Sequence, residues 1–136
     1  MSDKSTLSQF GHVFQSKTIS SLLSDKKFIQ TISDILEPEY FDSDANKWIC
    51  HEIREYFFEY KTPPTLEVMK VKIDDMENEV LQVSVVENLK EAWRNVKSTD
   101  LKFVQEQTLE FCKNQVMKQA IMNSVDLIEV GQYDQI

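Results

Sequence analysis

The sequence predicts an all-α protein, a small helical globule of about six helices that ends in a long C-terminal helix. The chain has 136 residues, of which 41% are hydrophobic and 10% aromatic, enough for one domain with a real core. It contains only two glycines and three prolines, too few for the turns that β-hairpins or βα units need. Apolar residues recur at the three-to-four spacing of amphipathic helices.

Residues that favour helix ends bound most of the expected helices. These are expected at about 7–23, from after Asp25 to before Pro38, at about 44–59, from after Thr65 to about Ile73, at about 77–96 and from Thr99 or Asp100 to Val130. Asp25 and Thr65 can cap the second and fourth helices, because their side-chain oxygens accept hydrogen bonds from N–H groups of the first turn. Either Ser43 or Asp42 can cap the third. The second helix stops before Pro38, since the residue before a proline avoids the α region.

The third and fifth helices carry most of the expected aromatic and aliphatic core. For the third helix the apolar positions are Ala45, Trp48, Ile49, Ile53, Tyr56, Phe57 and Tyr60. For the fifth they are Val80, Leu81, Val83, Leu89, Ala92, Trp93 and Val96. The aromatic side chains of the third helix could also stack on nucleic acid bases, but Arg and Lys residues are not interleaved with them. Core packing is therefore the favoured interpretation. Phe58 falls off the buried stripe and is a candidate for an exposed contact.

The last helix is too long for the body it packs against. About 30 residues at 1.5 Å each span roughly 45 Å, whereas a globule of this size is roughly 30–35 Å across. Residues 1–98 are therefore expected to form the body, and residues 99–136 a protruding helix. Its distal half could fold back on the first helix, but we favour contact with another molecule because apolar residues continue to its end. The candidate interface residues there are Met117, Ile121, Val125, Leu127 and Ile128.

No catalytic or nucleotide-binding pattern is found in the sequence. A phosphate loop needs two glycines five residues apart, followed by a lysine, which Gly11 and Gly131 cannot supply. No glycine-flanked serine nucleophile is present, and the chain has only two histidines. We therefore expect no catalytic residue and no cofactor-binding residue in this chain, which is not expected to be an enzyme.

Two short patterns resemble metal sites, but each lacks residues that such a site requires. Residues 42–46 begin like a calcium loop, but Lys47 stands where the loop needs glycine and Ile53 where it needs a bidentate glutamate. His51 and Glu55 are one helical turn apart, but two convergent ligands do not make a metal site. We expect helix capping in the first case and no metal in either.

Charge and hydropathy restrict the partners and the compartment. The net charge is −8 and no basic face is visible, so direct nucleic acid binding is not expected. The N-terminus lacks the apolar segment of a signal peptide, and no apolar window is long enough to span a membrane. Cys50 and Cys112 are predicted to be buried thiols rather than a disulfide framework. These features favour a cytoplasmic protein.

Three stretches, residues 14–41, 44–73 and 101–130, resemble the N-terminal domain of DnaB-family replicative DNA helicases, in particular their bacteriophage members. The first contains the turn SLLSDKKF and the corner EPEYF, the second the helix–turn–helix KWICHEIREYFFEYKTPPTLEVMKVKI. The third is the long helix LKFVQEQTLEFCKNQVMKQAIMNSVDLIEV. The order of these helices and turns carries the resemblance, which covers nearly the whole chain.

The resemblance implies that the last helix opens an antiparallel helical hairpin. In that family, hairpins of neighbouring subunits pair, and the N-terminal domains form a collar above a ring of ATPase motors. Primase docks on the collar and helicase loaders can act there. The expected partners are therefore a second copy of the chain, a primase and a loader.

The second hairpin helix and the motor domain that the family possesses are not found in this chain. The chain is therefore expected to be a fragment or a naturally truncated relative, with ATP and Mg²⁺ bound only by the motor. Two alternatives remain open. One is the helicase-binding module of a primase, and the other is a free-standing small helical regulator.

Overall fold

The protein is described by a computed structural model for residues 6–129, with side chains described as far as residue 127. Its α-helices are α1 (His12–Ser24), α2 (Lys26–Ile32), α3 (Asp44–Tyr60), α4 (Leu66–Asp74), α5 (Glu79–Arg94) and α6 (Leu101–Glu129). Two short 3₁₀ helices, η1 (Leu7–Phe10) and η2 (Pro38–Tyr40), precede α1 and α3. The described part of the chain has no strand. The predicted all-α class and the long C-terminal helix are confirmed. The expected helix end at Val130 lies outside the described residues.

The predicted first helix, 7–23, is wrong in one respect, because Gly11 interrupts it. Gly11 has φ 91° and ψ 172°, a conformation that side chains with a Cβ rarely adopt. The preceding residues form η1, in which the Thr6 hydroxyl caps the N-terminus. α1 then starts at His12.

The predicted second helix is too long at its C-terminal end. α2 stops at Ile32, and the N–H groups of Ile35 and Leu36 both donate to the Ile32 carbonyl, at 3.0 and 2.9 Å. The Ser33 carbonyl instead accepts a hydrogen bond from Nε of Arg54 on α3, at 2.8 Å. A side chain distant in sequence thus holds this turn, and Leu36 is completely buried within it.

The predicted caps are found. The Asp25 carboxylate accepts hydrogen bonds from two N–H groups in the first turn of α2, at 3.0 and 3.2 Å. Of the two candidates before α3, Ser43 is the cap, with a bond of 3.1 Å, and Thr65 caps α4 at 3.3 Å. α5 starts two residues later than expected because Asn78 caps it, at 3.0 Å.

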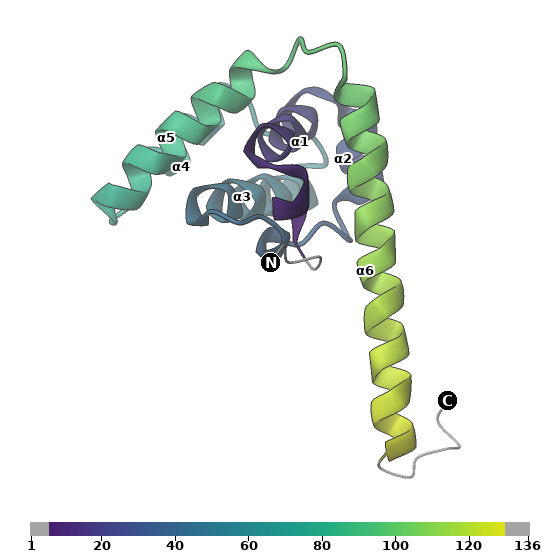
Figure 1. The fold of residues 1–136 in the computed structure, drawn as a ribbon. Coiled ribbons are helices and arrows are strands. Elements are labelled where there is room, and N and C mark those ends of the chain that lie inside the picture. The colour runs from purple at the N-terminus through teal and green to yellow at the C-terminus, as the bar shows by residue number, and fades with distance from the viewer. Residues whose placement is uncertain (1–5, 130–136) are drawn as a thin grey trace.

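The helices pack around α1. It contacts α2, α3, α5 and α6, while α4 lies against α5 (Figure 1). The core includes Leu7, Ile19, Leu22, Ile29, Ile32, Leu36, Phe41, Ile49, Ile53, Met69, Val85, Leu89 and Phe111. α6 runs along one side of this body and continues well past it (Figure 1).

The face that α5 buries agrees with the predicted one at Leu89 and Ala92 but differs elsewhere. Val85, Leu89 and Ala92 are buried against the body, whereas Val80 and Trp93 are exposed by 80% and 43%. Apolar residues lie on more than one side of α5, so periodicity did not identify the side that packs. Trp93 contributes to a groove described below.

Candidate interaction surface on the C-terminal helix

The first half of α6 is attached to the body by polar contacts. The hydroxyl oxygens of Thr108 and Thr18 of α1 lie 3.2 Å apart, and both side chains are completely buried. Nε2 of Gln105 donates to the Asp25 carboxylate at 3.2 Å. These contacts join α6 to α1 and to the start of α2, so the position of the helix is determined by the body.

An ion pair lies at the residue that precedes α6. Nζ of Lys17 on α1 is 2.9 Å from a carboxylate oxygen of Asp100. The hydrogen bond from Lys17 is the largest influence on Asp100 and lowers the pKa of its carboxyl group. Because Asp100 is solvent-exposed, this pair orients the chain at the helix start more than it stabilises the fold.

The packed part of α6 ends at Phe111 and Cys112. The Phe111 ring makes edge-on contacts with Phe10 and Tyr40, with centroid distances of 6.3 and 5.2 Å. The Cys112 side chain is completely buried, and burial raises the pKa of its thiol to about 12. No described side chain after Cys112 in α6 is buried.

Beyond this point the described side chains of α6 are no longer buried against the body. We call residues 113–129 the distal segment; at 1.5 Å per residue it extends about 25 Å. Its exposed hydrophobic side chains are Val116 (50%), Met117 (61%), Ile121 (57%), Met122 (56%) and Val125 (40%). Folding back onto α1, the alternative raised by the sequence, does not occur for these residues.

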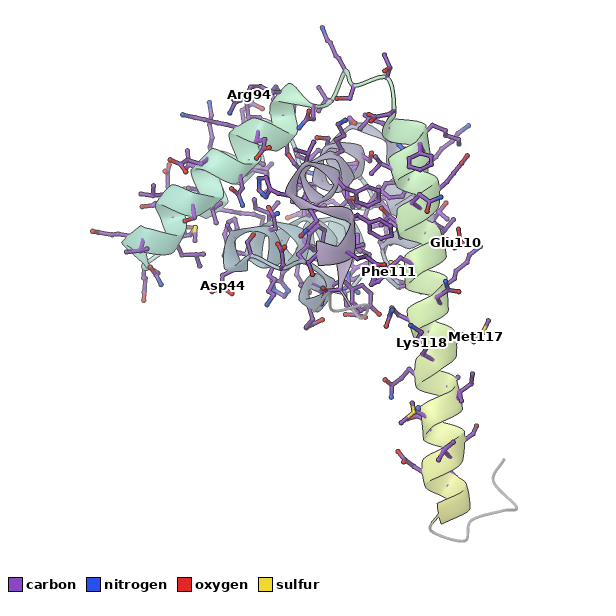
Figure 2. All side chains as sticks on the ribbon, viewed as in Figure 1. Asp44, Arg94, Glu110, Phe111, Met117 and Lys118 are labelled. Atoms are coloured by element: carbon purple, nitrogen blue, oxygen red, sulfur yellow. The ribbon has the colours of Figure 1, made fainter. Side chains whose placement is uncertain are left out.

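The exposed apolar residues form an outer face on the distal segment. Successive residues turn by about 100°, so Met117, Ile121 and Val125 share one side of the helix. The middle of this side is about 90° around the axis from the side that carries Val104 and Phe111. Figure 2 shows Phe111 facing the body and Met117 facing away from it. The outer face is therefore turned toward solvent and is accessible to another molecule.

A second apolar pair faces the corner between the distal segment and the body. Val116 and Ala120 line a hollow of about 620 Å³ there, together with Glu39 and Tyr40 from the region of η2. The hollow widens the surface that an incoming helix could contact. A partner lying along the distal segment can thus touch the body as well.

The structure separates the predicted interface residues into two places. Met117, Ile121 and Val125 lie together on the outer face, and Leu127 is half-buried near its end. The side chain of Ile128 lies outside the described residues. Phe58 belongs to α3 and does not line the hollow beside the distal segment.

Phe58 is exposed, in agreement with its position off the buried stripe of α3. Its side chain is 40% exposed, and the Arg54 guanidinium lies 5.4 Å from the centre of its ring. The same arginine bonds Glu37 at 3.1 Å. Part of the Phe58 surface is thus engaged within the chain, and its role in binding a partner stays a prediction.

Val116 and Met122 were missing from the predicted interface, although they are as exposed as its members. Their apolar character was visible in the sequence. Their exposure depends on where the body ends along α6, which periodicity alone cannot give. Val116 extends the surface toward the body and Met122 extends it to another side of the helix.

The residues considered as metal ligands either face solvent or contact a residue of another helix. His51 and Glu55 are both exposed on α3, and Nε2 of His12 lies 2.7 Å from the Glu91 carboxylate. Among residues 6–129, no group of three or more His, Cys, Asp or Glu side chains is arranged to hold a metal ion. Within the same residues, no helix combines the length and apolar character required to cross a membrane.

No family model, curated protein or solved structure matches this chain. Its function is therefore inferred from its own residues and their geometry.

Proposed function

We propose that this chain is the N-terminal collar domain of a bacteriophage-type replicative DNA helicase of the DnaB family. In this proposal the domain is a binding domain and not a catalytic one. It associates with copies of itself and binds a primase or a helicase loader in the cytoplasm of the host cell. The parent enzyme would couple ATP hydrolysis to DNA unwinding through a motor outside this chain. The order of helices and turns in the sequence supports the family assignment.

The observation that carries the proposal is the distal segment. It projects past the body and exposes Met117, Ile121 and Val125 on one outward side. An isolated helix with this much apolar surface in water is unfavourable, at about 25 cal/mol for each Å² of apolar area left exposed. A second helix packed on this face would remove that cost, as the second arm of a hairpin or the helix of a neighbouring subunit would.

The geometry also suits helix-on-helix packing. Met117, Ile121, Ser124 and Ile128 follow a four–three–four spacing, the period with which side chains of one helix interlock with those of another. Ala120 and Ser124 are small, so a partner backbone can approach closely beside the larger residues. We therefore expect an elongated helical contact rather than a compact pocket.

Sedimentation analysis of the wild-type chain and of Ile121→Asp and Val125→Asp tests this proposal. The wild-type mass should increase with concentration, while each aspartate variant should stay monomeric, because burying an unpaired carboxylate in a partner contact costs several kcal/mol. Helical content should stay the same by circular dichroism. A monomeric wild type, or variants that sediment like an associating wild type, would exclude the distal segment as the interface.

Phe103→Asp provides the matched control. Phe103 is 59% exposed on the same helix but lies in its first half, beside the body. Its replacement also adds one carboxylate and removes a large apolar side chain. Self-association should survive this change if the distal segment is the contact.

The reading frame downstream of Ile136 tests the family assignment separately. A phosphate loop of the form G-x-x-x-x-G-K-[ST] should follow if a helicase motor belongs to the same protein. A catalytic domain of primase encoded upstream would instead favour the helicase-binding module of a primase. A reading frame with neither domain would favour the free-standing helical regulator.

A further inference from the structure

α4 and α5 lie on the side of the body away from α6 (Figure 1). A second apolar surface lies between these two helices. It is a groove of about 680 Å³ that includes Leu66 of α4 with Val86 and Trp93 of α5. Leu66 and Val86 are half-buried and Trp93 is 43% exposed. We call it the α4–α5 groove. None of the distal-segment residues lines it.

The groove continues beyond Trp93. Leu66 and Trp93 also line a neighbouring hollow of about 540 Å³, which extends to Pro64 and Lys26. Trp93 therefore stands where the two hollows meet. The combined surface is elongated and has one large aromatic side chain near its middle, an arrangement typical of peptide-binding surfaces.

The charged residues beside the groove are mainly basic. Lys70, Lys90 and Arg94 line it, with Asp74 as the one carboxylate in the larger hollow. Within residues 6–129, none of these three cations forms an ion pair; Nε of Arg94 donates to the backbone carbonyl of Lys90 at 3.3 Å. Figure 2 labels Arg94 at the end of α5.

This local charge is opposite to that of the chain as a whole. The net charge is −8, yet three cations line the apolar groove. An anionic partner would meet complementary charge at this groove. Among apolar ligands, one that also carries carboxylates should therefore bind this groove more tightly than one that does not.

We propose that the α4–α5 groove binds an acidic amphipathic helix of a partner protein. Apolar side chains of that helix, spaced by three and four residues, would lie against Leu66, Val86 and Trp93. Glutamate or aspartate residues flanking them would pair with Lys70, Lys90 and Arg94. The inference rests on the proposed function only in expecting a protein partner, and it is independent of self-association.

Fluorescence anisotropy with two designed peptides tests the proposal on the full chain. Both have roughly four helical turns and the same leucine stripe, one flanked by glutamates and the other by lysines. The glutamate peptide should bind at least about tenfold more tightly at low salt, and added salt should reduce the difference. Equal affinity, or no saturable binding of the glutamate peptide, would overturn the proposal.

Substitutions inside and outside the groove test whether the peptides bind there. The double variant Lys90→Glu and Arg94→Glu changes only exposed side chains, and should weaken the glutamate peptide roughly tenfold while strengthening the lysine peptide. Trp93→Asp should abolish binding of both. Val80→Asp is the matched control, because Val80 is an 80% exposed residue of the same helix that does not line the groove. A fall in affinity with Val80→Asp as large as with Trp93→Asp would contradict the assignment.

Two further outcomes would assign the groove to another occupant and so reject the proposal. A single-stranded oligonucleotide could stack a base on Trp93 and pair its phosphates with the cations, so tighter binding of oligothymidine than of the glutamate peptide would indicate nucleic acid. Loss of self-association in Trp93→Asp would indicate a second copy of the chain. Ile121→Asp should leave peptide binding unchanged, which separates a failure of this inference from a failure of the proposed self-association.

Discussion

The two halves of α6 are both rich in apolar residues but differ in what surrounds them. In the proximal half, residues 101–112, Val104, Phe111 and Cys112 are buried against the body. In the distal segment, Met117 and Ile121 are exposed by 61% and 57%. The residues are similar in hydrophobicity, so composition does not explain the difference. It arises because the body ends beside Phe111 while the helix continues.

The apolar side chains of the distal segment are not confined to the side that the proximal half buries. Met117 and Ile121 lie about 140° and about 100° around the axis from Val104, whereas the exposed Met122 lies on the same side as Val104. A helix that continued to pack on one body would keep its apolar residues on one side. The spread of apolar residues around the distal segment therefore favours a second binding partner, distinct from the body.

The largest effect that distinguishes the two halves should come from deleting one large side chain in each. Phe111→Ala should lower the free energy of unfolding by about 3–5 kcal/mol, because it leaves a cavity between Phe10 and Tyr40. Met117→Ala should change it by less than about 0.5 kcal/mol in the monomer. Urea denaturation followed by circular dichroism measures both, at a protein concentration where the chain is monomeric. Similar losses in the two variants would mean that the distal segment is packed in solution.

The two buried thiols should make the free energy of unfolding depend on pH, an effect of intermediate size. Burial raises the pKa of Cys50 and Cys112 from 9.0 to about 12, so both thiols stay protonated in the folded chain when the unfolded chain has ionised. The unfolded state then binds fewer protons, and the free energy of unfolding falls as pH rises above 9, by about 1.4 kcal/mol per pH unit for each thiol. Urea denaturation between pH 8 and pH 10.5 measures the slope, which replacing both cysteines by alanine should reduce.

Thiol reactivity extends the same comparison to the distal segment. At about pH 8, Cys50 and Cys112 should react with a disulfide reagent only after unfolding, because the thiolate is the reactive form and the folded thiols are protonated and inaccessible. Ile121→Cys should add one thiol that reacts at once in the monomer. Rapid reaction of Cys112 would show that the proximal half of α6 separates readily from the body.

The smallest effect should occur at the exposed start of α6. The hydrogen bond from Lys17 lowers the pKa of Asp100 below 3.8, so any stabilisation by this pair is present above that value and is lost as pH falls through the lowered pKa. An NMR titration of the Asp100 carboxyl group measures the midpoint. Lys17→Ala should move the midpoint up toward 3.8 with little change in the melting temperature, since surface ion pairs contribute little. An unchanged midpoint would show that the pair does not form.

Local signals in the sequence predicted several elements correctly. Asp25, Ser43 and Thr65 cap helices as expected, because capping depends only on a side-chain oxygen and N–H groups two or three residues later. Gly11 was the visible signal for the break that was missed. Its positive φ is a local property of glycine, but the sequence could not show that this glycine uses it.

The turn after α2 and the packing of α1 required contacts between distant residues. Arg54 bonds the Ser33 carbonyl from another helix, which ends α2 earlier than its apolar pattern indicates. α1 is the central helix although Ser16, Thr18 and Ser20 are buried in it. The Ser20 hydroxyl lies within hydrogen-bond distance of carbonyl oxygens in α1 and α5, so this buried polar group is satisfied where the two helices approach closely.

For the candidate interaction surface, too, the sequence predicted some features and the tertiary structure determined the others. Helical period and chain length alone predicted a final helix longer than the body and apolar to its end, because rise per residue and side-chain direction are properties of any α-helix. Which of its residues remain exposed, and on which side, followed only from the point where the body ends beside Phe111. The groove at Trp93 likewise depends on how α4 and α5 meet, since burial is a property of packed neighbours and not of a residue type.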